Sequence, residues 1–332
     1  MKVTVYFLIF LFSIQLKAQC AKELNIYEHF QLATKTDTIQ YSIYTKNGIE
    51  STTKLLVFVQ GSGAFPFYEI EKITDGTVTT STMPFELEMI PDEYAFVLIS
   101  KKGIPFCTLK ENQFQAPKEF YETEGLEYRA NRISAVIDYL IHNQITNPKK
   151  IAVIGHSEGS DVVAKLGVIN NNITNIGYWS GGGNTQFYDF TLFIRKDVIE
   201  GKLTEEEGIQ KIDSILKQFK EIKQKPESTT DFWEDNSYRR WNYFSEPPID
   251  NLLKITIPIF VAIGSKDQAV PVESAYLIPI EFIRQKKDNL TFKVYPALDH
   301  GFERELENGE FEDHWNDVFQ DFLNWVNSNS TK

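Results

Sequence analysis

The alternation of short apolar runs with helical patterns is the feature of this sequence that most constrains its fold. Continuous or period-two apolar runs indicate strands, and apolar residues spaced three and four apart indicate helices. The predicted strands are 38–45 (TIQYSIYT), 54–60 (KLLVFVQ), 93–100 (EYAFVLIS), 149–155 (KKIAVIG), 175–180 (NIGYWS), 255–264 (ITIPIFVAIG) and 290–296 (LTFKVYP). Helical patterns separate the later strands. This order predicts an α/β fold with a mostly parallel central sheet flanked by helices.

The predicted helices carry one apolar stripe each, as helices that cover a sheet do. They lie in 119–143, after the strand at 149–155, in 272–285 and at the C-terminus from Trp315. The first stripe consists of Leu126, Ala130, Ile133, Ile137 and Leu140.

One segment, at about residues 185–250, interrupts this alternation. It contains a charged helical pattern at 204–224 and an aromatic-rich stretch at 231–248, without a convincing strand. Because a loop of that length without its own structure is unusual in a compact domain, we expect a small helical cap over one end of the sheet. We call residues 185–250 the cap segment.

Length, composition and charge bound the class of protein. The 332 residues, of which 42% are apolar and 14% aromatic, suffice for one large domain with a substantial core. The net charge of −12 is spread along the chain without a long basic block, so nucleic acid is not an expected partner.

The N-terminus is typical of a secretory signal peptide. Lys2 precedes an apolar run from Val3 to Leu16, and Ala18 then offers a small residue for cleavage. We therefore expect residues 1–18 to be removed and the domain 19–332 to be periplasmic or secreted, with no transmembrane helix. Lipid attachment at Cys20 is a less favoured alternative, because Lys-Ala-Gln precedes this cysteine instead of a lipid-attachment box.

The cysteine and histidine patterns give no support for a bound metal. Cys20 and Cys107 are the only cysteines, and the sequence leaves open whether they pair. Neither a CxxC pair nor an HExxH motif occurs, so we expect no metal and no other cofactor.

The stretch 149–167 (KKIAVIGHSEGSDVVAKLG) places a serine at a junction between a strand and a helix. A serine hydroxyl acts as a nucleophile only when a base accepts its proton and backbone N–H groups lie near the developing oxyanion. A sharp turn from strand to helix exposes Ser157 in this way, and Gly155 and Gly159 stand where side chains would collide. We therefore interpret Ser157 as a nucleophile.

Two later sites complete a pattern that resembles the α/β-hydrolase family, in which serine, acid and histidine follow in this chain order. Asp267 lies in VAIGSKDQAVP after one late strand, and His300 lies in VYPALDHGF after the next. The resemblance spans most of the chain after the N-terminal run and implies that Asp267 orients His300, the general base. Glu273 and Asp299 are weaker candidates for the acid, and His156 is expected to be structural.

The family's oxyanion donors correspond to two backbone N–H groups here. One is the N–H of Glu158, directly after the serine, and the other lies in the loop VFVQGSG, where we assign it to Ser62. Gln60 replaces the histidine that is common in this loop. A solvated or hydrogen-bonded carboxylate is the favoured interpretation of the Glu158 side chain, and contact with a cationic substrate group is the alternative.

The resemblance implies a serine hydrolase that acts through an acyl-enzyme. We expect its substrate to be a carboxylic ester or thioester of modest size, because export and an aromatic cap over the serine suit small apolar acyl groups. Trp233, Tyr238, Trp241 and Phe244 are candidates for an acyl pocket, although aromatic residues at these spacings also suit the core of the cap.

Two other functions remain open. One is a serine peptidase of the same fold, for which the acidic residues in and near the cap segment would hold a substrate amine. The other is a binding protein that has kept the fold without the chemistry, which the presence of all three candidates disfavours. The sequence does not determine the oligomeric state.

Overall fold

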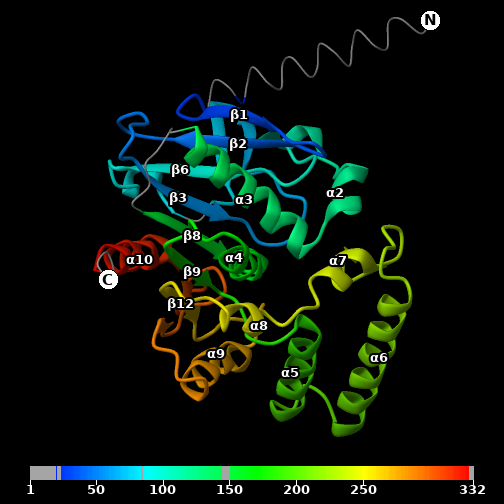
Figure 1. Cartoon of the computed structure of the whole chain (residues 1–332). Helices are drawn as coiled ribbons and strands as arrows, with labels where there is room; N and C mark the ends of the chain where they lie inside the picture. The colour runs from blue at the N-terminus through cyan, green and yellow to red at the C-terminus, as the bar shows by residue number, and fades with distance from the viewer. Residues whose placement is uncertain (1–19, 21–23, 84, 144–149, 329–332) are drawn as a thin grey trace, which may run out of the picture.

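The computed structural model describes residues 20, 24–83, 85–143 and 150–328, and its centre is an eight-stranded sheet (Figure 1). Its order is β1-β2-β6-β3-β8-β9-β12-β13. The strands are β1 (Glu28–Ala33), β2 (Thr38–Tyr44), β6 (Tyr94–Ile99), β3 (Lys54–Val59), β8 (Ile151–His156), β9 (Asn175–Trp179), β12 (Ile259–Gly264) and β13 (Leu290–Tyr295). β1 and β2, and β2 and β6, pair antiparallel, whereas all other neighbours pair parallel. The predicted α/β class is confirmed.

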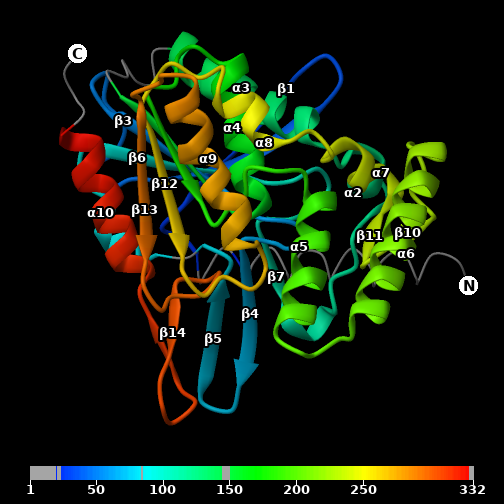
Figure 2. The same cartoon turned by 90° about the horizontal axis from the view of Figure 1, so that it is seen from below.

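Helices cover both faces of this sheet and bury a separate hydrophobic core on each (Figure 2). One face carries α3 (Leu126–His142), α4 (Glu158–Ile169), α8 (Pro248–Leu252) and α9 (Val272–Arg284), and the other carries α10 (Trp315–Ser328). Every residue of the predicted stripe on α3 is buried. The sheet is therefore enclosed, as the continuous apolar runs of its parallel strands require.

The helix predicted over 119–143 is divided in the structure. α2 (Lys118–Thr123) and α3 are separated at Gly125, whose backbone is extended. A Cβ atom on Gly125 would lie 3.0 Å from Cβ of Tyr243, so the chain leaves the helical path where a helix of the cap segment approaches closely.

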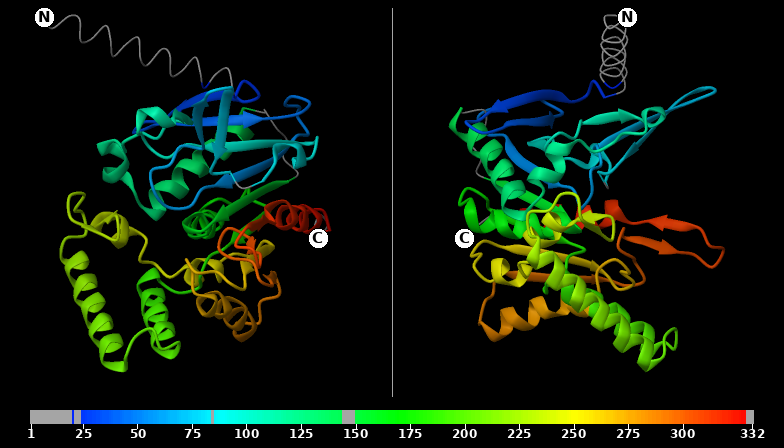
Figure 3. Two further views of the ribbon diagram at one scale, coloured as in Figure 1. Left: turned by 180° about the vertical axis from the view of Figure 1, so that it is seen from behind. Right: turned by 90° about the vertical axis from the view of Figure 1, so that its right-hand side faces the viewer.

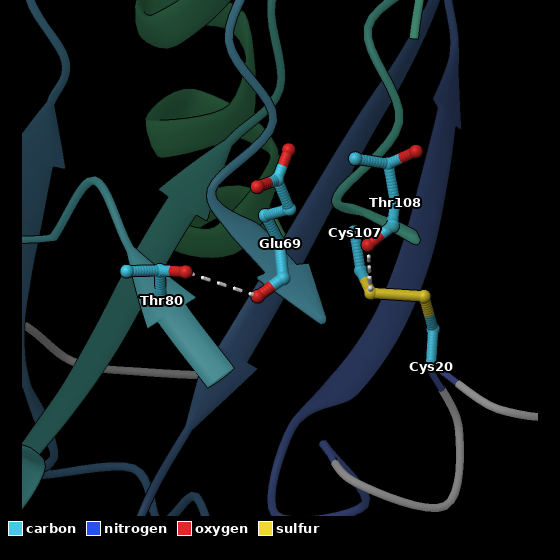
Figure 4. Close-up of a disulfide and its surroundings, with 5 residues drawn as sticks. All are labelled: Cys20, Glu69, Thr80, Cys107 and Thr108. Atoms are coloured by element: carbon cyan, nitrogen blue, oxygen red, sulfur yellow. Dashed lines mark hydrogen bonds between the residues drawn. A yellow bond between two sulfur atoms is a disulfide. The ribbon is translucent and has the colours of Figure 1, made fainter. Parts of the chain in front are cut away.

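A second, three-stranded sheet lies where the sequence shows only a polar, Thr-rich stretch. β5 (Gly76–Ser81), β4 (Tyr68–Ile73) and β7 (Cys107–Leu109) form it in that order, and short 3₁₀ turns lie at Leu87–Met89 and Lys110–Asn112. A disulfide joins Cys107 of β7 to Cys20, which settles the pairing that the sequence left open (Figure 4). A further hairpin consists of β14 (Glu303–Glu305) and β15 (Phe311–Asp313).

The cap segment is mostly helical and projects to one side of the sheet (Figure 3). It contains α5 (Gln186–Ile199), α6 (Glu205–Gln224), the two-residue strands β10 (Phe232–Trp233) and β11 (Asn236–Ser237), and α7 (Tyr238–Tyr243). α6 begins with a capping box in which Thr204 and Glu207 exchange hydrogen bonds. Near the end of the segment, α8 returns to the main core through Ile249 and Leu252.

The predicted signal peptide lies outside the described residues. Within residues 20, 24–83, 85–143 and 150–328, no helix is both long and apolar enough to cross a bilayer.

Candidate active site

Ser157 lies in a strained turn at the carboxyl end of β8, directly before α4. Its backbone has φ 56° and ψ −128°, a combination that non-glycine residues rarely adopt. A Cβ atom on Gly155 would lie 2.0 Å from the carbonyl oxygen of Gly159, and one on Gly159 would lie 2.2 Å from the carbonyl oxygen of Val59. Both glycines are therefore needed for the close packing of this turn, which presents the Ser157 side chain above the sheet.

Asp267 and His300 meet at the same end of the sheet, because each follows the carboxyl end of a parallel strand. His300 Nδ1 lies 2.8 Å from Oδ2 and 3.0 Å from Oδ1 of Asp267. Asp267 is 4% exposed, and its Oδ1 also accepts hydrogen bonds from the backbone N–H groups of Ala269 and Val270. These bonds fix the carboxylate, which in turn orients the imidazole with Nε2 free for chemistry.

Asp299 and His156, which lie close to Asp267 and His300, have other hydrogen-bond partners. Asp299 Oδ1 accepts hydrogen bonds from the N–H groups of Gly301 and Glu303, so it stabilises the turn that carries His300. His156 Nε2 lies 2.9 Å from the carbonyl oxygen of His300, and burial lowers the pKa of His156 to about 3. A neutral His156 therefore supports the His300 loop.

The loop after β3 lies directly beside the serine. A Cβ atom on Gly61 would lie 3.2 Å from Cβ and 3.6 Å from Oγ of Ser157. Lys101 Nζ donates to the carbonyl oxygens of Gly61, at 2.7 Å, and Gly63. Arg129 Nη2 donates to the carbonyl oxygen of Gln60 at 2.6 Å. Because two buried basic side chains donate to its carbonyl groups, the loop has a fixed orientation.

The backbone N–H groups predicted to bind an oxyanion are those of Ser62, in this loop, and of Glu158, the first residue of α4. An N–H group at this helical position has no intrahelical acceptor, and the helix dipole there favours negative charge. The N–H groups of Ser62 and Glu158 thus belong to the two segments that border the Ser157 side chain.

The Glu158 side chain is not solvated but lies at the centre of a buried ion cluster. Arg129 Nη1 donates to its Oε1 at 2.7 Å, and Arg240 Nε, from α7 of the cap segment, donates to its Oε2 at 2.7 Å. Burial acts to raise the pKa of Glu158, but Arg240 and Arg129 outweigh it and hold the pKa below its usual value. The cluster connects the cap segment to the residue that follows Ser157.

Two more groups near this cluster have shifted pKa values. Burial lowers the pKa of Lys101 to about 7 and raises that of Glu124 to about 7.

Two cavities meet at Ser157 and Ser62. The first, which we call the cap pocket, has a volume of about 340 Å³ and includes Ser62, Ser157, Glu158, Asp161, Asp189, Phe190, Phe193, Arg240 and Trp241 in its lining. The second, which we call the histidine pocket, has a volume of about 230 Å³ and is lined by Phe58, Gln60, Gly61, Ser62, Phe65, Thr82, His156, Ser157 and His300. Ser62 and Ser157 therefore line both cavities.

Of the four aromatic residues predicted to line an acyl pocket, only Trp241 lines the cap pocket. Trp233 and Tyr238 pack with Trp241 in the small core of the cap segment, and Phe244 is buried in the main core. These three side chains therefore lie in cores, and the same apolar character would have suited a pocket.

Asp161 and Asp189 are pocket residues that the sequence analysis missed. Asp161 lies one helical turn after Ser157 on α4, and Asp189 lies in the first turn of α5. The spacing of four residues from Ser157 was an available signal for Asp161, whereas Asp189 depends on where the cap segment packs.

Comparisons with known proteins agree with this architecture. The model of the Dienelactone hydrolase family matches residues 237–330. A search of curated proteins finds no significant match.

Three solved structures share the fold at low sequence identity. They are the acylaminoacyl peptidase of Pyrococcus horikoshii (14% identity, TM-score 0.51, 86% of this chain and 39% of that chain), Est1E from Butyrivibrio proteoclasticus (13%, 0.51, 92% and 99%) and a 2,6-dihydroxy-pseudo-oxynicotine hydrolase (15%, 0.57, 93% and 70%). The chain thus spans well under half of the peptidase but nearly all of Est1E.

The mostly parallel sheet and the turn at Ser157 define an α/β-hydrolase fold. The chain therefore has the fold of the α/β-hydrolases, and its C-terminal part, residues 237–330, is similar to the Dienelactone hydrolase family.

Proposed function

We propose that this protein is a serine hydrolase that cleaves a carboxylic ester or thioester through an acyl-enzyme. The observation that carries this proposal is the convergence of the strained Ser157 turn and the Asp267–His300 pair at one end of the sheet, where Ser157 and His300 line the same cavity.

In the proposed reaction, His300 Nε2 accepts the proton of Ser157 Oγ while this oxygen attacks the substrate carbonyl. The backbone N–H groups of Ser62 and Glu158 bind the resulting oxyanion. The protonated His300 then gives its proton to the leaving oxygen or sulfur. A water molecule, deprotonated by His300, attacks the acyl-enzyme and releases the acid, which restores the Ser157 hydroxyl.

This proton transfer indicates which part of the substrate each cavity binds. Because His300 must protonate the leaving atom, we place the leaving group in the histidine pocket, beside Phe58 and Phe65. The acyl group then occupies the cap pocket on the other side of Ser157.

We also propose that the mature protein is exported. The Cys20–Cys107 disulfide supports an oxidising compartment, periplasmic or extracellular. The same disulfide argues against lipid attachment at Cys20, because its sulfur is already bonded.

The test of the reaction uses purified mature protein and its Ser157→Ala variant with p-nitrophenyl esters of increasing acyl length. The proposal predicts turnover in the parent protein and a loss of at least a thousandfold in kcat in the variant. Equal turnover by the two proteins would contradict it.

A serine peptidase is the second candidate function, and the buried carboxylates of Asp161 and Asp189 in the cap pocket favour it. Aminoacyl p-nitroanilides distinguish the two candidates: faster turnover of the anilides than of the esters assigns a peptidase.

A further inference from the structure

Two buried carboxylates face the cap pocket from different elements of the fold. Asp161 on α4 and Asp189 on α5 are each 7% exposed. The two carboxylates lie near each other, with Tyr178 and Gly182 between them. The Tyr178 hydroxyl lies 3.2 Å from Asp161 Oδ1 and 2.6 Å from the carbonyl oxygen of Gly182. A Cβ atom on Gly182 would in turn lie 3.1 Å from Asp189 Oδ2.

The hydrogen-bond donors that contact these carboxylates are neutral. Asp161 Oδ2 accepts a hydrogen bond from the Gln186 side-chain amide at 3.3 Å. Asp189 Oδ1 is buried and has no hydrogen-bond partner among the described residues. A buried acceptor without a partner is destabilising, and more so when it is charged, so a hydrogen-bond donor of a ligand is strongly favoured at this oxygen.

No basic side chain in the described part of the chain lies within 4.0 Å of either carboxylate in an ion pair. Arg240, the basic residue among those that line the pocket, is paired with Glu158 through Nε and Nη2. Two buried acids without a counter-ion therefore line a cavity that is large enough for a small ligand.

We propose that the cap pocket binds an acyl group that carries a protonated amine, with Asp189 and Asp161 as the counter-ions of that amine. The inference deepens the proposed function and rests on it for the acyl side of the site. The substrate class is an amino-substituted ester, thioester or amide, whose leaving group lies in the histidine pocket.

The pKa values of the two acids agree with this geometry. Burial raises the pKa of Asp161 to about 7 and that of Asp189 to about 7. A cation that enters the pocket lowers both pKa values and completes their ionisation.

A carboxylate-bearing acyl group is the opposite assignment, because Arg240 Nη1 is also buried without a hydrogen-bond partner among the described residues. Glu158 is shared between Arg240 and Arg129, so it balances Arg240 only in part. The carboxyl groups of Glu158, Asp161, Asp189 and Glu234 nevertheless all line the pocket, and they outnumber these two arginines, so the pocket is negative once its acids are ionised and favours a cation.

A binding experiment tests this inference without relying on turnover. Titration calorimetry with the Ser157→Ala protein compares hexylammonium, hexan-1-ol and hexanoate. The inference predicts that hexylammonium binds at least tenfold more tightly than the other two, that Asp189→Asn abolishes this preference, and that Asp197→Asn, a change on the same helix at an ion pair with Lys202, preserves it. Tighter binding of hexanoate, or equal binding of all three ligands, would overturn the inference.

A kinetic experiment extends the test to the reacting substrate. Pairs of methyl esters differ only in an amine or a methyl group at one position, such as methyl 6-aminohexanoate and methyl heptanoate, or methyl glycinate and methyl propanoate. In at least one pair we expect kcat/KM to be tenfold higher for the amine, and to fall to that of its partner in Asp189→Asn. Asp197→Asn should keep the amine preference in the same assay, and thermal unfolding of Asp189→Asn checks that this variant is folded.

The two experiments separate failure of the inference from failure of the proposed function. Turnover of both ester types without an amine preference overturns the inference and leaves the hydrolase intact. Absence of all ester turnover contradicts the proposed function, and the calorimetric ranking then still decides what the pocket binds.

Discussion

The buried carboxylate of Asp189 makes the pH dependence of stability a direct test of the described packing. An unfolded aspartate ionises near pKa 3.8, and burial raises the pKa of Asp189 in the folded protein to about 7. Because the folded pKa is the higher one, the stabilisation is fully present below about pH 4 and is lost as the pH rises through about 7.

The size of the effect follows from this shift. A difference of about 3 pKa units corresponds to about 4 kcal/mol over the whole range, of which about 2.5 kcal/mol falls between pH 5 and pH 8. Asp189→Asn is neutral at every pH and does not lose this stability. Since 1 kcal/mol shifts the melting temperature of a large domain by about 2–4 °C, the variant gains roughly 5–10 °C on the parent protein between these pH values.

Scanning calorimetry of the unliganded proteins at pH 5, 6, 7 and 8 measures this difference directly. Asp197→Asn is the matched control, because Asp197 lies on the same helix and pairs with Lys202 near the surface. If the melting temperatures of Asp189→Asn and the parent protein differ by the same amount from pH 5 to pH 8, Asp189 does not have the raised pKa of a buried carboxylate.

Three other perturbations give distinct outcomes. Glu158→Gln leaves two buried arginines without a counter-charge and should cost about 3–5 kcal/mol in urea unfolding; unchanged stability would contradict the ion cluster. Lys101→Met removes the donor to the Gly61 and Gly63 carbonyls and should lower kcat roughly tenfold or more with little change in KM, whereas a change confined to KM would argue against loop positioning. Cys107→Ser removes a disulfide between residues 87 apart in sequence and should lower the free energy of unfolding by about 4–5 kcal/mol. If the parent protein melts at the same temperature with and without reductant, the disulfide is disproved.

The central sheet was predictable from sequence because its strands are buried on both faces. β3, β8, β9 and β12 read as continuous apolar runs, and the helices that cover them show single stripes. The β4–β5 hairpin was missed because most of β5 is exposed, so neither side of the strand needs apolar residues. No periodicity marks such a strand, and only its pairing with β4 reveals it.

The residues around Ser157 were predictable for a different reason. Parallel strands bring their carboxyl ends to one edge, so Ser157, Asp267 and His300 could be located from the ends of their strands alone. The structure places Asp267 beside His300 and Gly61 beside Ser157, as these positions require. Their catalytic roles remain a prediction.

The ion cluster and the acidic pocket could not be predicted in the same way. Arg240 reaches Glu158 across 82 positions of sequence, and this contact depends on how α7 packs on the rest of the fold. Charged residues are common in this chain, and nothing in the sequence distinguishes the buried Arg240 and Asp189 from the exposed charges around them. For the aromatic residues of the cap segment, packing alone separates a core position from a pocket position.

Covalent labelling shows whether Ser157 is a nucleophile activated by His300. The protein is incubated with a fluorophosphonate, and mass spectrometry of its peptides locates the adduct. We expect one adduct, on Ser157, which does not form at a comparable rate in His300→Ala. An unlabelled protein, or an adduct on another serine with Ser157 unmodified, would contradict this expectation.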